Sequence, residues 1–173
     1  EYGRGAMRWS ILTDRLPVTV KIGEEEHELD VRTSTALNCL RKLREDIPDG
    51  VKSLYVTRRL GLPPDALDKA VWFLEGPNKP TGKGEASFDY FQDANVIYGA
   101  FQQAYGLGLE EVTGMHWWAF LALLEAIPSG TRFMDIVGIR TMEIYPDDSA
   151  DVRRRKLRAK ASVALKTGKK LEW

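Results

Sequence analysis

The chain has 173 residues, of which 43% are hydrophobic and 29% are charged, so it can bury a core and keep an ordinary hydrated surface. Basic and acidic residues number 25 each, which excludes an overall electrostatic attraction to nucleic acid or to anionic membranes. A single cysteine excludes an internal disulfide framework, and two histidines leave little material for a metal site.

These limits favour one domain with an appended arm. No run approaches the roughly 18 to 20 apolar residues of a membrane span, and the chain opens without a signal segment, so we expect a cytosolic protein. Residues 1–6 precede Met7 and are expected to be a cloning remnant. The domain is expected over residues 7–146, followed by a basic C-terminal helix or arm over residues 147–173.

A β-hairpin is predicted first. Apolar and polar residues alternate over residues 18–22 and again over 27–31, which is typical of two short strands that share one apolar face. Gly23 begins the turn between them, and the acidic run 24–26 is expected to be its solvated tip. A hairpin this short needs helices to pack on.

Three antiparallel helices with short connections are predicted next, over residues 33–47, 51–60 and 65–74. The run Thr33-Ser34-Thr35 offers N-caps for the first helix. Cys39 within that helix has no neighbouring histidine or lysine cluster, so we interpret it as a packing residue and not as an activated thiolate.

A loop and an aromatic helix follow. Residues 76–87 include no large apolar side chain, which predicts a flexible loop. After Asp89, apolar residues recur at helical spacing up to Gly106, and such a stripe usually belongs to a core. The stripe consists of Tyr90, Ala94, Ile97, Tyr98, Phe101, Ala104 and Tyr105.

The most apolar stretch is 115–127, which contains only two polar residues. At about 100° per residue, Trp117 and Phe120 share the core face of one helix. Trp118 lies about a quarter-turn from the centre of that face. The helix therefore either buries a second side or shows this indole to a partner, and the sequence leaves both interpretations open. We expect His116 to pack and form hydrogen bonds, with a general base as the alternative.

Two further helices complete the chain. Thr131 is a plausible N-cap for a helix over 132–137, and the run 147–149 is expected to cap a final helix. Residues 147–173 contain nine basic and four acidic residues, and the apolar side of this last helix is thin. Such a helix often projects or binds a partner. The expected partner-binding residues are Trp118, Val152, Arg153, Arg154, Arg155 and Leu157.

The elements together predict a mainly α fold: a compact helical domain with a small N-terminal β-hairpin and a basic C-terminal helix. The sequence lacks a glycine-rich phosphate loop and the common metal, thiol and serine motifs of catalytic sites. We therefore expect no enzyme activity, no cofactor and no metal. Nucleic-acid binding by the basic helix is kept as an alternative, because local charge matters more than the neutral total.

Asp93 and Arg140 are polar residues among apolar neighbours. We expect Asp93 to favour the first turn of its helix and Arg140 to face solvent or Glu143. A buried or half-buried ion pair between Asp93 and Arg140 is the alternative.

The region from residue 88 to residue 140 resembles a family of tailed phages and prophages often called gene product fifteen. The order of a hairpin followed by helices, from residue 14 to residue 74, looks similar too. The members of the pattern that we interpret as structural are Asp93, Tyr98, Phe101, His116, Trp117, Phe120, Phe133 and Arg140. The shared pattern is Phe88-Asp89-Tyr90, Asp93-Ala94, Ile97-Tyr98, Ala100-Phe101, Tyr105-Gly106, His116-Trp117-Trp118, Phe120, Leu123, Pro128, Thr131, Phe133, Ile136 and Arg140.

The resemblance implies a tail-assembly chaperone, or a related morphogenesis factor, encoded just upstream of the tape-measure gene. Such a protein would coat the tape-measure protein in the host bacterial cytoplasm until the tail tube polymerises around it. The implied partners are the tape-measure protein and a companion tail chaperone, without a membrane, and a homo-oligomer is left open. A structural component of the virion tail is the alternative.

Overall fold

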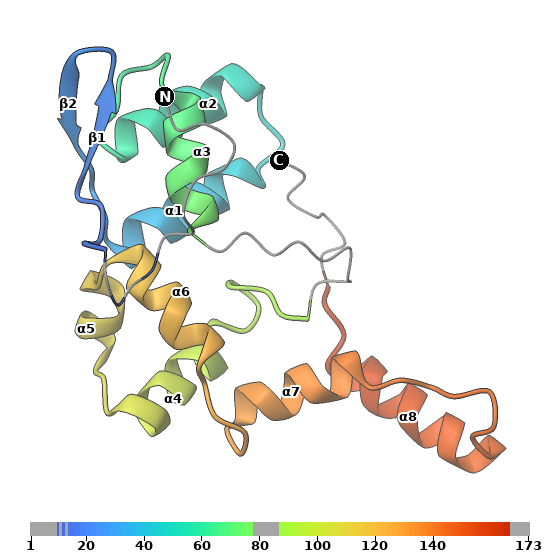
Figure 1. Cartoon of the computed structure of the whole chain (residues 1–173). Helices are drawn as coiled ribbons and strands as arrows, with labels where there is room; N and C mark the ends of the chain where they lie inside the picture. The colour runs from blue at the N-terminus through green and yellow to red at the C-terminus, as the bar shows by residue number, and fades with distance from the viewer. Residues whose placement is uncertain (1–9, 11, 13, 78–86, 167–173) are drawn as a thin grey trace. The chain divides into compact units, whose positions relative to one another are not determined.

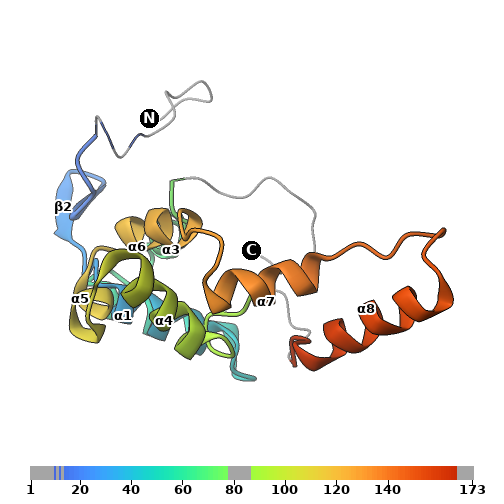
Figure 2. The same cartoon turned by 90° about the horizontal axis from the view of Figure 1, so that it is seen from below.

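The structure is a computed structural model that describes residues 10, 12, 14–77 and 87–166. Over these residues it has eight helices and one two-stranded sheet (Figure 1, Figure 2), which confirms the mainly α prediction with an N-terminal hairpin. The residues cluster into two compact units, Glu1–Gly82 with Glu110–Leu123 and Lys83–Leu109 with Leu124–Trp173. The final helix groups with the second unit. Most of the loop expected at 76–87 lies outside the described residues.

The hairpin of the first unit pairs β1 (Thr19–Ile22) with β2 (Glu25–Glu28) in an antiparallel ladder. Gly23 opens the connecting turn with φ of 60°, a left-handed conformation that suits glycine. The acidic run was expected to form the tip, but only Glu24 does so, because the turn is short and the next two glutamates pair within β2.

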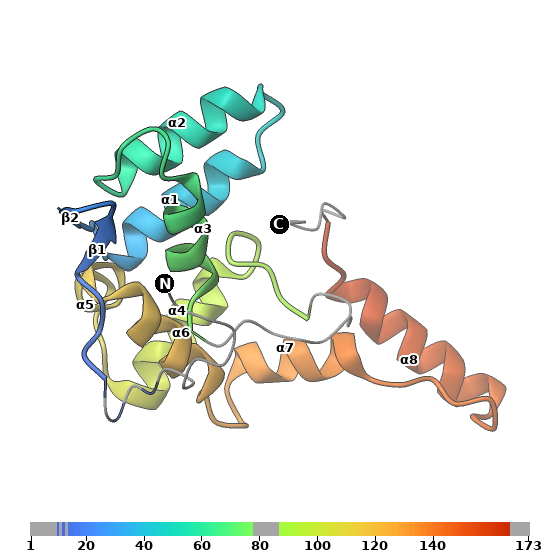
Figure 3. The same cartoon turned by 45° about the horizontal axis from the view of Figure 1, so that its top comes forward.

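The three predicted helices are present as α1 (Thr33–Leu43), α2 (Asp49–Arg59) and α3 (Leu67–Glu75). Figure 3 shows α2 beside α1, and α2 also contacts α3. Helix α1 is shorter than predicted. Cys39 is fully buried in it, and burial raises the pKa of its thiol to about 12, which confirms that it is a packing residue.

The expected N-cap of α1 is wrong. Arg32 occupies the cap position and makes no capping bond through its side chain. The threonines are buried and have other partners: the Thr33 hydroxyl donates to the Met115 carbonyl at 3.0 Å, and the Thr35 hydroxyl donates to the Asp30 carboxylate at 2.8 Å. These hydroxyls therefore join α1 to distant and preceding chain segments instead of closing its first turn.

Helices α5 (Leu109–Gly114) and α6 (Trp117–Glu125) follow later in the chain. The segment between them forms an antiparallel bridge, in which the Thr33 N–H donates to the Met115 carbonyl at 2.8 Å and the Trp117 N–H donates to the Val31 carbonyl at 2.7 Å. Backbone hydrogen bonds thus join the start of α6 directly to the start of α1.

Both tryptophans of α6 are buried, with 1% of Trp117 and 2% of Trp118 exposed. The Trp117 indole N–H donates to the Leu74 carbonyl at 3.0 Å, and the Trp118 indole N–H donates to the Phe73 carbonyl at 2.8 Å. Carbonyls in the last turn of a helix lack intrahelical partners, and Pro77, four residues after Phe73, has no N–H to donate. The two indoles therefore cap the C-terminus of α3.

Trp118 is consequently a core residue, and its interpretation as an exposed partner-binding side chain is corrected. Its ring stacks on Phe73 with centroids 6.2 Å apart, and Trp72 meets its edge at 5.1 Å. The exposed indole of this cluster is that of Trp72, at 42%. Trp117 stacks on the buried ring of Phe120 at 5.4 Å, as expected for the core face.

His116 is the N-terminal cap of α6. Its Nδ1 accepts the Trp118 backbone N–H at 3.0 Å, and its Nε2 lies 2.9 Å from the Pro17 carbonyl. A neutral ring with its proton on Nε2 satisfies both contacts. Burial lowers the pKa of His116, and the carbonyl of Pro17 partly opposes this shift. The packing and hydrogen-bonding role expected for His116 is confirmed.

The second unit contains α4 (Ala94–Tyr105), α7 (Arg132–Thr141) and α8 (Ala150–Ser162), and α7 contacts the other two. Phe101 and Phe133 are buried, whereas Tyr98 is half-buried. The N-caps are as predicted, since Thr131 accepts the Met134 N–H and Ser149 accepts the Val152 N–H, both at 3.3 Å. No helix among those described is long and apolar enough to span a bilayer.

Replacement of Trp118 by phenylalanine should destabilise the protein by at least about 1 to 3 kcal/mol, the usual cost of leaving a buried polar group without a partner. The group concerned is the Phe73 carbonyl, which accepts the Trp118 N–H. The same replacement at Trp72, which is 42% exposed, serves as the control and should cost less than about 1 kcal/mol. Urea unfolding followed by circular dichroism measures both. Equal losses would show that the indole N–H does not stabilise α3.

Replacement of His116 by asparagine should remove one component of the pH dependence of stability. Because the folded-state pKa lies below the ordinary 6.5, the unfolded chain binds the proton first. This contribution is complete above about pH 6.5 and is lost as the pH falls from there towards the folded pKa. Asparagine keeps an acceptor for the Trp118 N–H but does not titrate.

The measurement is the free energy of unfolding of both proteins over this pH range. The native protein should lose stability more steeply than His116→Asn as the pH is lowered. Parallel pH profiles would contradict a neutral, half-buried His116.

Candidate partner-binding site

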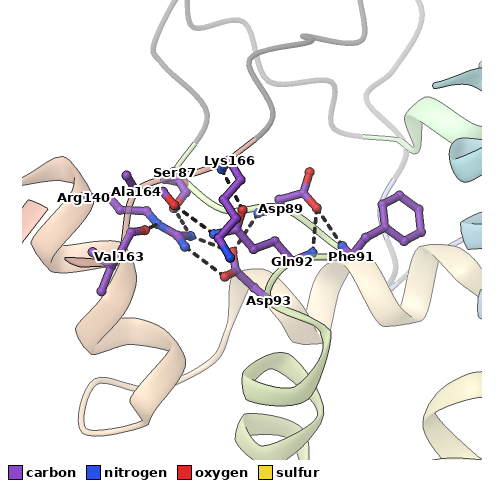
Figure 4. A network of polar contacts seen from close by, with 9 residues as sticks. All are labelled: Ser87, Asp89, Phe91, Gln92, Asp93, Arg140, Val163, Ala164 and Lys166. Atoms are coloured by element: carbon purple, nitrogen blue, oxygen red, sulfur yellow. Dashed lines mark hydrogen bonds and ion pairs between the residues drawn. The ribbon is translucent and has the colours of Figure 1, made fainter. Parts of the chain in front are cut away.

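A buried ion pair joins α7 to the segment before α4 in the second unit (Figure 4). Arg140 of α7 donates to both carboxylate oxygens of Asp93, at 2.6 and 2.9 Å, and the side chains are only 8% and 5% exposed. The expectation that Arg140 faces solvent is therefore wrong, and the alternative ion pair is right. The guanidinium also donates to the carbonyls of Val163 and Ser87, at 2.6 and 3.2 Å, so it joins α7 to the segment before α4 and to the residue after α8.

A hydrogen-bonded turn before α4 holds Asp93 in position for the ion pair. The Asp89 carboxylate accepts the N–H groups of Phe91 and Gln92, both at 2.8 Å, and the Asp93 carboxylate accepts the Asp89 N–H at 2.9 Å. These bonds hold residues 89–93 in a turn, which explains why α4 begins later than the aromatic stripe predicts.

The side chain of Gln92 binds backbone atoms of the segment after α8. Its side-chain amide donates to the Ala164 carbonyl at 2.9 Å and accepts the Lys166 N–H at 2.8 Å (Figure 4). An amide that pairs in this way imitates a neighbouring β-strand. Together with the bond from Arg140 to the Val163 carbonyl, it anchors the end of α8 to the rest of the second unit.

The other anchor of α8 is the linker that precedes it. Figure 2 shows α8 running back along this linker after α7. Lys156 pairs with the Asp148 carboxylate at 2.7 Å and donates to the Glu143 carbonyl at 3.1 Å, and Lys160 donates to the Met142 carbonyl at 2.7 Å. The lysine beside Asp148 lowers the pKa of that carboxyl group. Polar contacts therefore hold α8 in place, and none of its residues is fully buried.

The two sides of α8 differ. Val152, Lys156 and Ala159 are half-buried, so Val152 offers a partner less surface than was expected. Its position follows from the helical period, which places it with Lys156. The opposite side is exposed and carries Leu157 at 52% exposure. Arg155 is also exposed, and its Nε donates to the Asp151 carbonyl.

A shallow depression lies on this exposed side. It has a volume of about 490 Å³, and we call it the α8 groove. Arg154 forms an ion pair with Asp151 on the surface, while Arg153 donates to the Pro146 carbonyl at 3.1 Å. Residues that line the α8 groove are Asp148, Ala150, Arg153, Arg154 and Leu157.

The structure thus separates the expected site residues. Arg153, Arg154 and Leu157 come together in the α8 groove, Arg155 lies exposed on the same helix, and Val152 and Trp118 lie elsewhere. The contacts of Asp148, Lys156 and Gln92 were not predicted, because a periodic pattern shows which side of a helix is buried but not which polar groups pair. Among the residues described, no group of three or more histidine, cysteine, aspartate or glutamate side chains could hold a metal ion.

A family model for the "Bacteriophage Gp15 protein" matches residues 12–165, which is most of the chain. The chain belongs to this family. Membership in the Gp15 family confirms the resemblance inferred from the sequence and indicates a phage morphogenesis or structural protein. No curated protein and no solved structure matches the chain.

Replacement of Arg140 by methionine should destabilise this Gp15 protein by about 3 to 5 kcal/mol, because it leaves the Asp93 charge buried and unpaired. The Arg132→Met variant, changed at an exposed position of the same helix, should stay within about 0.5 kcal/mol of the native protein. Urea unfolding provides the comparison. An Arg140→Met variant as stable as its control would argue against a structural role for the ion pair.

Proposed function

We propose that the protein is a tail-assembly chaperone, which binds the tape-measure protein in the host cytoplasm before the tail tube polymerises. The family match supports a role in phage morphogenesis. The observation that carries the finer proposal is that α8 is a complete helix without a fully buried residue. A chaperone for a long helical protein needs a surface of this kind, on which an amphipathic segment can lie.

The construction of α8 suits such a surface. Most helices in proteins owe their stability to an apolar face packed on a core, whereas α8 is attached through lysine contacts to its linker and through the backbone of residues 163–166. Among the described residues, those on its outer side are exposed. We propose the α8 groove as the contact, with Leu157 as its apolar centre. The proposal includes no enzymatic step.

The internal contacts of α8 weaken the nucleic-acid alternative. Lys156, Lys160 and Arg153 donate to carbonyls or to a carboxylate of the linker, so part of the positive charge is already used within the protein. A protein that follows a phosphate backbone instead needs its cations directed outwards.

Co-expression of the protein with the tape-measure protein of the same phage tests the proposal. The tape-measure protein should become soluble and should co-purify with this protein, whereas it should aggregate when expressed alone. An unrelated soluble protein of similar size serves as the control for a general effect of expression.

A tape-measure protein that remains insoluble in the presence of this protein would contradict chaperone activity. Purified virions provide the second measurement. Presence of the protein at a fixed copy number per particle would favour a structural tail component instead.

A further inference from the structure

The outer side of α8 has a defined pattern of residues. At about 100° per residue, Ala150, Leu157 and Ala161 point in nearly the same direction, and Arg154 lies between them. All four are exposed. Small residues on both sides of one leucine would let a second helix approach closely, at the usual interaxial distance of about 8–10 Å. The surface is therefore shaped for a helix.

Positive charge surrounds this apolar line. Helix α8 carries six basic residues and one acidic residue, Asp151. The side chain of Arg158 makes no hydrogen bond or ion pair with the part of the chain that the structure describes. The Arg154 ion pair with Asp151 is on the surface, with side chains 71% and 73% exposed, and such pairs contribute little net energy. Arg154 can thus exchange Asp151 for a carboxylate of a partner.

We propose that the α8 groove binds an amphipathic α-helix whose apolar stripe is flanked by aspartate or glutamate. The proposal rests on the proposed function and specifies the chemistry of the segment that is bound. Leucine-sized side chains of this segment pack on Leu157 and into the depression beside Ala150. Its carboxylates pair with Arg154 and Arg158, since an arginine side chain can cover apolar surface with its stem and still present its charged end to a carboxylate.

Charge selects this occupant over the alternatives. A second copy would place one α8 against another, and the excess of basic residues on both helices would repel. A nucleic acid would use the arginines but leave Leu157 without an apolar contact. An acidic amphipathic helix satisfies both the arginines and the leucine.

Three labelled synthetic helices of equal length test the proposal by fluorescence anisotropy with the full-length protein. The first has a leucine stripe flanked by glutamate, the second replaces the glutamates with lysine, and the third keeps the glutamates but replaces the leucines with glutamine. The first should bind at least about tenfold more tightly than either of the others, a ratio that corresponds to the loss of a few good contacts. Added salt should weaken its binding.

Variants of the full-length protein locate the binding surface. Leu157→Gln, and separately the double change Arg154→Gln with Arg158→Gln, should each weaken binding of the first peptide by about tenfold. The matched controls are on α2: Leu54→Gln, since Leu54 is 49% exposed against 52% for Leu157, and Arg58→Gln with Arg59→Gln. The controls should bind the peptide like the native protein. Circular dichroism verifies that each variant is folded.

Three results would overturn the proposal. The first is equal binding of the glutamate and lysine peptides. The second is equal loss of binding in the α8 and α2 variants. The third is a duplex DNA that binds more tightly than the acidic peptide and is unaffected by Leu157→Gln, which would indicate nucleic-acid binding.

Failure of the proposed function has a different outcome. Binding of the acidic peptide at α8 without co-purification of the tape-measure protein would contradict the chaperone role and leave the α8 chemistry intact. Co-purification that is unaffected by the α8 variants would do the reverse.

Discussion

Two indole N–H groups organise the first unit. Trp117 and Trp118 donate to the last-turn carbonyls of α3, one of which faces a proline that cannot supply a helical hydrogen bond. A helix can end inside a protein only when its final carbonyls find donors, and here the donors come from another helix more than forty positions later in the chain. Helix α3 can therefore end where it does only if α6 packs against it and supplies these donors.

This arrangement assigns the most recognisable residues of the chain to its interior. His116 fixes the start of α6, the two tryptophans cap α3, and Asp93 with Arg140 neutralise each other in the second unit. The two tryptophans and the ion pair are buried, so a partner cannot reach them while the units stay folded. Residues that identify the family thus explain how the chain folds, and the residues proposed to act on a partner lie on the much plainer helix α8.

Local chemistry was readable from the sequence, and distant pairing was not. Thr131 and Ser149 cap the helices that they precede because a cap needs only the next few residues. Thr33 has the same chemistry, but its hydroxyl is used by the Met115 carbonyl, which no local rule could reveal. The burial of Trp118 and Arg140 was not predicted for the same reason, since their hydrogen-bond partners are also distant along the chain. The periodic spacing of apolar residues shows which side of a helix is buried, but the partner of a polar atom depends on which segments the fold brings together.

The Gln92 amide holds the segment after α8 through main-chain atoms, so this attachment places little constraint on the side chains of that segment. Because it holds the Ala164 carbonyl and the Lys166 N–H, and Arg140 holds the Val163 carbonyl, the attachment depends on main-chain atoms that almost every amino acid provides. Side chains in this segment can therefore vary with little effect on where α8 is held. A phage lineage could alter the outer side of α8 and the residues beyond it to follow a changing partner, while the site of attachment stays the same.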